Sequence, residues 1–175
     1  ANFDLNITNV KTTITSKINT LYPGGYTPMR YALKLAIDYM NKKGRPNAVK
    51  ALVVLSDGDY NYYGDPLARG NVGPSAGDDS EYQNTIRDYV QFTGVPSQNM
   101  ATYANRSKIR IFTIQYANGA SSEGILALNL LASQTGGKPY SALSEAQLAQ
   151  VYTQIAGSLR DEASVNTTMN LAFRS

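Results

Sequence analysis

The chain has 175 residues, of which 42% are hydrophobic and 17% are charged. This length suits one domain with a hydrophobic core, and the composition excludes a disordered chain. The 16 Lys and Arg exceed the 13 Asp and Glu, which gives a net charge of +3, but they are spread along the sequence. Because no basic stripe could follow a phosphate backbone, we expect no nucleic-acid partner.

The chain contains neither cysteine nor histidine. Their absence excludes disulfides, the usual zinc sites, a thiol nucleophile and a Ser-His-Asp triad. The chemistry that remains uses carboxylates, hydroxyls, lysines or a hard cation bound through oxygen. No apolar run approaches the roughly 20 residues that span a bilayer, so we expect no membrane insertion by this segment.

The N-terminal part of the chain predicts a strand followed by two helices. Apolar residues alternate over residues 3–7 as in a strand, and they recur at helical spacing over residues 10–21. Thr27 and Pro28 form a pair that is typical of an N-cap and a first helical position, and the helix they begin is expected to run through Met40.

An unbroken apolar run at residues 51–55 predicts a strand that is covered on both faces, which favours a parallel sheet. Residues 60–80 are rich in Gly, Pro, Asp, Asn and Tyr, and they predict a long loop. The rest of the chain predicts helices at 82–92, 100–103, 125–132 and 144–159, strands at 109–115 and 139–140, and an alternating tail at 168–173.

The alternation of helices with apolar strands predicts an α/β domain of three layers, in which helices flank a mainly parallel sheet. Ligands of such sheets bind beyond the carboxyl ends of the strands. This rule directs attention to residues 56–59, which follow the strand predicted at 51–55.

Asp57 and Asp59 form the first candidate site, with Asn61 two residues further on. Their spacing matches the start of an EF-hand calcium loop, but Tyr62 and Ala68 stand where that loop needs Gly and Glu, so the EF-hand hypothesis fails. A simple turn remains an alternative for this segment. A carboxylate after a buried parallel strand nevertheless stands where α/β sheets bind ligands.

The second candidate is the segment Gly24-Gly25-Tyr26-Thr27-Pro28. The glycine pair allows a tight turn, and the Thr27 hydroxyl at a helix N-terminus can either cap the helix or bind a hard cation. The residues alone leave both roles open.

Five segments in the same order resemble the von Willebrand factor type A domain over nearly the whole chain. They are residues 24–28, the helix through Met40, the strand that ends in 53–59, the strand 109–115 and the segment 130–140. The resemblance implies a Rossmann-like fold and a divalent cation, usually Mg²⁺ and otherwise Mn²⁺ or Ca²⁺. In the family an Asp-x-Ser-x-Ser motif, a Thr and an Asp hold this ion. Thr27 and Asp57 match the second and third contributions as metal ligands.

No Asp-x-Ser-x-Ser motif occurs in the sequence, and residues 3–7 match the third strand of the family. The resemblance therefore implies that residues 1–164 are the C-terminal portion of such a domain without its first strands, and that 165–175 form a tail or begin a following segment. The cation is then expected in the intact domain, which has the Asp-x-Ser-x-Ser motif, and it can be absent from residues 1–175 alone. The strand 51–55 is expected to have an open edge. We expect a strand-mediated dimer or a missing N-terminal piece to fill it, rather than residues 3–7 or 168–173.

The resemblance implies a cation-dependent, adhesion-type module that binds a protein or another ligand, in an extracellular or cell-envelope protein. Its partner is expected to be a protein that offers a carboxylate, in contact with Tyr26, Asp59, Tyr60 and Tyr62. One alternative is a metal-free scaffold in an assembly. The other is a metal-assisted phosphoester hydrolase that uses Asp57 and Asp59, but no P-loop accompanies them, so we expect no enzyme.

Overall fold

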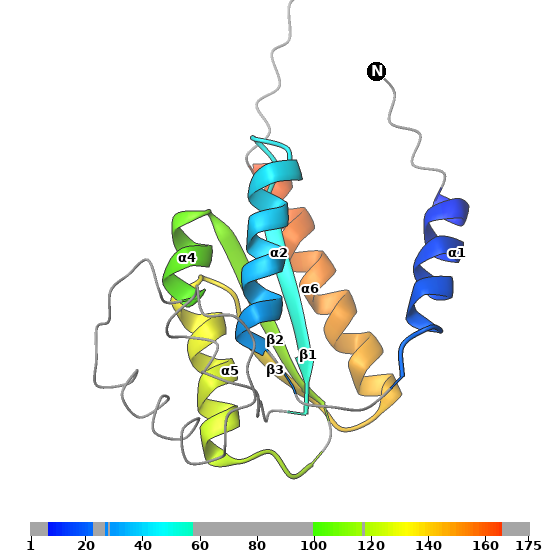
Figure 1. Ribbon diagram of the computed structural model, residues 1–175, viewed down its shortest axis with the longest axis vertical. Coiled ribbons are helices and arrows are strands. Elements are labelled where there is room, and N and C mark those ends of the chain that lie inside the picture. Colours follow the sequence, from blue (N-terminus) through cyan, green and yellow to red (C-terminus); the bar gives the residue numbers. More distant parts are fainter. Residues whose placement is uncertain (1–6, 23–26, 28, 58–99, 117, 166–175) are drawn as a thin grey trace, which may run out of the picture.

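The computed structural model describes residues 7–22, 27, 29–57, 100–116 and 118–165 (Figure 1). Within these ranges the chain alternates helices and strands, as the sequence predicts. The helices are α1 (Ile7–Ile18), α2 (Met29–Lys43), α4 (Met100–Arg106), α5 (Ser122–Gln134) and α6 (Glu145–Val165), and the strands are β1 (Lys50–Ser56), β2 (Ile109–Tyr116) and β3 (Pro139–Ala142).

The three strands form one parallel sheet in the order β1-β2-β3. Helices α2, α4 and α5 cover one face of the sheet, and α6 covers the other (Figure 1). This arrangement confirms the predicted α/β class, with a parallel sheet between helical layers. The strands predicted at 51–55, 109–115 and 139–140 are confirmed as well.

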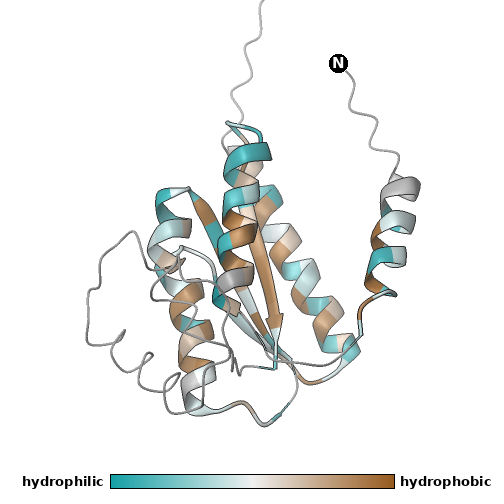
Figure 2. Ribbon diagram, viewed as in Figure 1, coloured by the Kyte–Doolittle hydropathy of each residue, from teal (hydrophilic) through white to brown (hydrophobic). Residues whose placement is uncertain are grey.

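The first core lies between the sheet and α2, α4 and α5. Its fully buried members include Ile37 from α2, Ala104 from α4, Leu131 from α5 and Ile111 from β2. Apolar residues spaced three and four apart place one stripe of each helix against the sheet, as the brown faces in Figure 2 show. Burial of these stripes stabilises the three helices against the sheet.

The second core lies on the other face, where Phe112 and Ile114 of β2 meet Val151 and Ile155 of α6. Ser144 and Gln147 cap the start of α6 with two hydrogen bonds. The Ser144 hydroxyl accepts a hydrogen bond from the backbone N–H of Gln147 at 3.3 Å, and the Gln147 side chain accepts one from the N–H of Leu143 at 2.6 Å. Along α6, Val151 and Ile155 are buried, Leu148 and Leu159 are partly buried, and Tyr152 is exposed.

The connection from α5 to β3 passes very close to β2. The buried Thr135 hydroxyl accepts a hydrogen bond from the N–H of Ile111 at 2.9 Å and donates one to the carbonyl of Leu131 at 2.8 Å. A Cβ at Gly137 would lie 1.9 Å from the carbonyl oxygen of Ile111. Only glycine therefore allows the chain to turn into β3 at this point.

The prediction that β1 is covered on both faces is wrong. Val53 and Leu55 are 39% and 47% exposed, because α6 packs against β2 and β3 and leaves this face of β1 open. Within the described ranges β1 pairs with β2 alone, so its other edge has no strand beside it. The dimer or N-terminal piece expected at this edge stays a prediction.

The N-terminal strand prediction is wrong at Ile7, which opens α1 instead. The helix expected over 10–21 ends at Ile18, and Ile14, Ile18 and Leu21 are exposed. α1 stands to one side of the sheet in Figure 1. The predictions for residues 3–6, 60–80, 82–92 and 168–173 lie outside the described residues.

Candidate binding site at the carboxyl edge of the sheet

All three strands end at one edge of the sheet, which we call the carboxyl edge. Ser56 of β1, Gln115 of β2 and Ser141 of β3 stand side by side in the register of the strands. Because α2 runs back against β1, the beginning of α2 lies at the same end of the molecule as the end of β1 (Figure 1). Thr27, just before α2, and Asp57, just after β1, thus reach the same edge from separate parts of the chain.

Asp57 is exposed at this edge, and the Ser56 hydroxyl lies 3.5 Å from its carboxylate in a long hydrogen bond. Thr27 is partly buried. α2 begins at Met29, and the predicted first helical residue, Pro28, is outside the described residues. The cap role of Thr27 therefore stays a prediction, as do the metal-binding roles of Thr27 and Asp57.

Helices α2, α5 and α6 all begin at the carboxyl edge (Figure 1). A helix N-terminus carries a partial positive charge from its backbone dipoles. The first turn of α2 contains no acidic residue, whereas α6 has Glu145 there. The Ser121 hydroxyl caps α5 by accepting a hydrogen bond from the N–H of Gly124 at 3.0 Å. The field at the beginning of α2, which no acidic residue of its first turn offsets, favours an anionic group near the edge.

The residues described at this edge do not by themselves form a tight metal site. In the described part of the chain no three acidic side chains stand close enough together to hold a metal ion. Thr27 and Asp57 supply one neutral oxygen and one carboxylate, whereas Mg²⁺ takes six oxygen ligands. An ion held by these two side chains alone would keep most of its coordination sphere in water.

The other predicted contact residues lie outside the described ranges. They are Tyr26, Asp59, Tyr60 and Tyr62. Their contact with a partner stays a prediction.

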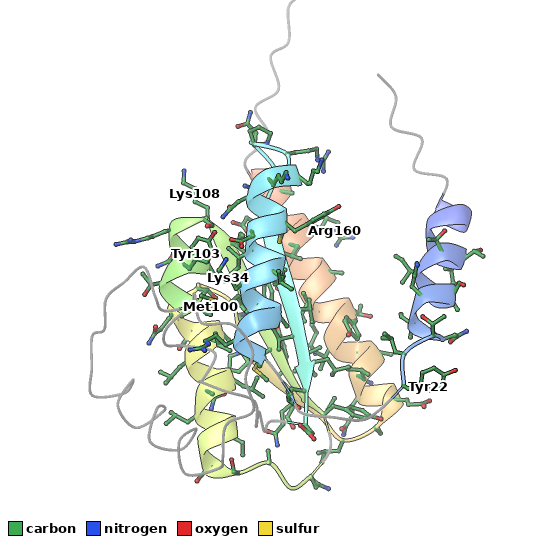
Figure 3. The ribbon with its side chains drawn as sticks, in the orientation of Figure 1. Tyr22, Lys34, Met100, Tyr103, Lys108 and Arg160 are labelled. Atoms are coloured by element: carbon green, nitrogen blue, oxygen red, sulfur yellow. The ribbon has the colours of Figure 1, made fainter. Side chains whose placement is uncertain are left out.

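A polar cluster between α2 and α4 was not predicted from the sequence. Asp38 accepts hydrogen bonds from the Lys34 ammonium at 2.6 Å and from the Tyr103 hydroxyl at 2.5 Å. Figure 3 shows Lys34 and Tyr103 close to each other at the contact between the two helices. The four-residue spacing of Lys34 and Asp38 is readable in the sequence. Tyr103 follows Asp38 by 65 residues, so only the fold brings them together.

The same hydrogen bonds shift two pKa values. The pKa of Asp38 is lowered, first by its hydrogen bond from Lys34 and then by that from Tyr103, because both stabilise the carboxylate. The pKa of Tyr103 is raised, since an ionised phenol would lose its bond to Asp38 and face a negative charge. The cluster joins two helices and stands away from the carboxyl edge, so we assign it a structural role.

The family model of the von Willebrand factor type A domain matches residues 1–154. The match confirms the resemblance inferred from the motifs, and it covers most of the chain. No curated protein and no solved structure matches the chain. Domains of this type are generally interaction modules and not enzymes. The fold, the order of the motifs and the match to the family model together show that the chain belongs to the von Willebrand factor type A domain family.

Proposed function

We propose that this chain is a cation-dependent protein-binding module of a secreted or cell-surface protein, and that it captures a carboxylate of its partner at the carboxyl edge. The observation that carries the proposal is the placement of Thr27 and Asp57 at one edge of the sheet. A hard cation held partly by a neutral hydroxyl would keep residual positive charge and an open position for a carboxylate.

The surroundings of the edge support an anionic partner group. Three helices direct their N-termini to this edge, and α2 has no acidic residue in its first turn to offset that charge. The secreted or cell-surface location is supported by the family, whose domains often occur in extracellular proteins. Among the described helices none has the length and apolar character needed to cross a membrane.

Calorimetric titration of the chain with Mg²⁺ and with Mn²⁺ tests the cation site. We expect weak binding, with a Kd of about 10⁻³ M, because two side chains supply few of the six ligands. Asp57→Ala should abolish the binding, and Thr27→Ala should weaken it. Asp161→Ala is the matched control, since it also removes an exposed carboxylate, from the far half of α6, and should leave the titration unchanged.

A second experiment tests the partner chemistry. An immobilised peptide with a single Glu should retain the wild-type chain in Mg²⁺ and release it in EDTA, and the Gln version of the peptide should not retain it. Cation binding that survives in Asp57→Ala would remove this residue from the site. If EDTA does not release the chain from the Glu peptide, the binding does not depend on a cation and the proposal is contradicted.

A metal-free interaction scaffold is the second candidate function. The observation that favours it concerns the ligands available beside Thr27 and Asp57. In the described ranges no three acidic side chains stand close enough together to hold a metal ion. The same calorimetry separates the two candidates. If the wild-type chain takes up neither Mg²⁺ nor Mn²⁺ at 10 times the expected Kd, the metal-free scaffold replaces the cation-dependent module.

A further inference from the structure

The basic residues, which look scattered in the sequence, gather at the end of the sheet opposite the carboxyl edge. We call this end the amino edge; here β1 and β2 begin, and α2 and α4 end. Half of the chain's 16 Lys and Arg residues lie there, namely Lys42, Lys43, Arg45, Lys50, Arg106, Lys108, Arg110 and Arg160. The C-terminal ends of α2 and α4 favour cations in their last turns, which accounts for Lys42, Lys43 and Arg106 but not for the other five residues.

The basic residues surround a hollow of about 1120 Å³ between the loop 45–49, the first residues of β1 and β2, and the last turns of α6. Five of them line it: Arg45, Lys50, Lys108, Arg110 and Arg160. Apolar side chains from the loop and from α6 form most of the remaining wall, together with Asn47 and Glu162. The hollow thus combines positive charge with apolar surface.

Most of this positive charge is not neutralised by the acidic side chains that the structure describes. Arg110 forms an ion pair with Glu162, and Arg160 lies 3.8 Å from Asp161 in a pair that is almost fully exposed and therefore weak. Among the described residues no acidic side chain forms an ion pair with Arg45, Lys50 or Lys108. At least three cations thus face a hollow that contains one paired carboxylate.

The backbone presents Lys108 at the rim of the hollow. Lys108 has a φ of 55°, in the left-handed region that a non-glycine residue seldom adopts, and its N–H donates to the carbonyl of Asn105 at 2.9 Å. Its side chain extends away from the sheet at the same end of the molecule as Arg160 (Figure 3). Glycine would form this turn with less strain, so the lysine contributes a charge that the turn does not require.

We propose that the amino edge is a second interaction surface, which binds an acidic segment of a partner protein. Unpaired cations supply the charge complementarity, and the apolar wall fits hydrophobic side chains between the acidic ones. A nucleic acid fits less well, because its phosphate backbone would leave the apolar wall without a partner. This surface is separate from the carboxyl edge and needs no cation.

Fluorescence anisotropy tests the proposal with a labelled peptide of four Asp-Glu-Leu repeats, in EDTA and at 50 mM and 150 mM NaCl. EDTA removes any cation-dependent binding, so failure here and failure at the carboxyl edge are distinguishable. We expect the wild-type chain to bind this peptide, more tightly at the lower salt concentration, and to ignore the peptide in which Asn and Gln replace Asp and Glu.

Two double variants with the same change in net charge locate the binding. Lys50→Gln with Lys108→Gln should weaken the affinity about tenfold, since two charge pairs are lost. Lys11→Gln with Lys17→Gln removes two exposed charges from α1 and should change nothing. Equal losses in both variants would mean that only net charge matters, and would overturn the proposal.

A single variant separates binding from folding. Lys108→Gly relieves the left-handed backbone, so it should keep or raise the thermal stability while it lowers the affinity for the acidic peptide. Absence of peptide binding by the wild-type chain would overturn the proposal. So would tighter binding of a labelled 20-nucleotide DNA than of the peptide, which would identify the surface as one for nucleic acids.

Discussion

β1 and β2 are neighbouring strands, but they differ in their strand pairing and in how far helices cover them. β2 pairs with a strand on each edge and is covered by helices on both faces, whereas β1 pairs with β2 alone in the described ranges. Val53 and Phe112 are neighbours in register and point to the same face, but Val53 is 39% exposed and Phe112 is 2% exposed. The difference arises because α6 lies across β2 and β3.

The sequence of an apolar strand therefore does not reveal whether the strand is central or lies at an edge of the sheet. The run at 51–55 is wholly apolar, whereas the run at 109–115 includes Arg110 and Gln115, yet both suggest a buried strand and the less apolar run is the more buried one. Burial depends on which helix crosses the strand, and the strand itself does not encode that helix. We therefore expect packing around β2 to contribute most to the free energy of unfolding of this domain.

The largest expected effect comes from truncating the register neighbours Phe112 and Val53. Phe112→Ala should lower the free energy of unfolding by about 4 kcal/mol, because it opens a cavity under α6. Val53→Ala should lower it by less than about 1 kcal/mol, since part of the side chain is already in water. Urea denaturation measures both values. Equal losses would mean that this face of β1 is covered in solution.

A second pair of variants tests how tightly the chain surrounds β2. Gly137→Ala should cost about 3 kcal/mol, because its Cβ would press on the backbone of Ile111, which cannot move away without disturbing both edges of β2. Gly136→Ala should cost about 1 kcal/mol, since Gly136 has a φ of 74° but open space around it. Thermal unfolding compares the two. A milder effect at Gly137 than at Gly136 would show that β2 is less confined than the structure indicates.

The smallest expected effect concerns the contact between α2, which covers β1, and α4, which leads into β2. Tyr103→Phe should cost about 1 kcal/mol at neutral pH, because Asp38 loses a hydrogen bond. The exposed Tyr152→Phe serves as the control and should change nothing measurable. A loss of several kcal/mol in Tyr103→Phe would mean that this contact, and not the packing around β2, dominates the fold.

The pH dependence of the same variant has a definite sign. The native pKa of Asp38 is lowered, so its stabilising contribution is present above the ordinary carboxyl range and is lost as pH falls through the native value. The difference between wild type and Tyr103→Phe should therefore shrink below about pH 4. The raised pKa of Tyr103 implies a further loss for the wild type alone as pH rises from the ordinary phenol pKa through the raised native pKa. Denaturation at a series of pH values measures both the loss of stability at low pH and the loss at high pH.

Local patterns in the sequence were sufficient to predict most of the described fold. The stripes along α2, α5 and α6 and the apolar runs of β1 and β2 carry their own periodicity, so these elements were predicted correctly. The alternation over residues 3–7 was too short to distinguish a strand from a helix, and Ile7 proved helical. The rule for parallel sheets pointed to Asp57, and only the resemblance to the family joined Thr27 to it.

The features that the sequence did not reveal depend on contacts between distant residues. Lys50, Lys108 and Arg160 are far apart in the chain, and only the parallel strands and α6 bring them to one hollow. The bond between Tyr103 and Asp38 has the same origin. Charge that looks dispersed in one dimension can be concentrated in three, and no local pattern reports that.

Because the strands are parallel, the carboxyl edge and the amino edge lie at opposite ends of the sheet, and dissolved ions can act on each edge separately. β1 has seven residues, which at about 3.3 Å each separate the two edges of the sheet by about 23 Å. At physiological ionic strength the Debye length is about 8 Å, so charges at one edge are screened from those at the other. The two proposed surfaces would then respond to separate solutes. Raising monovalent salt would release an acidic segment from one, and removing divalent ions would release a partner from the other.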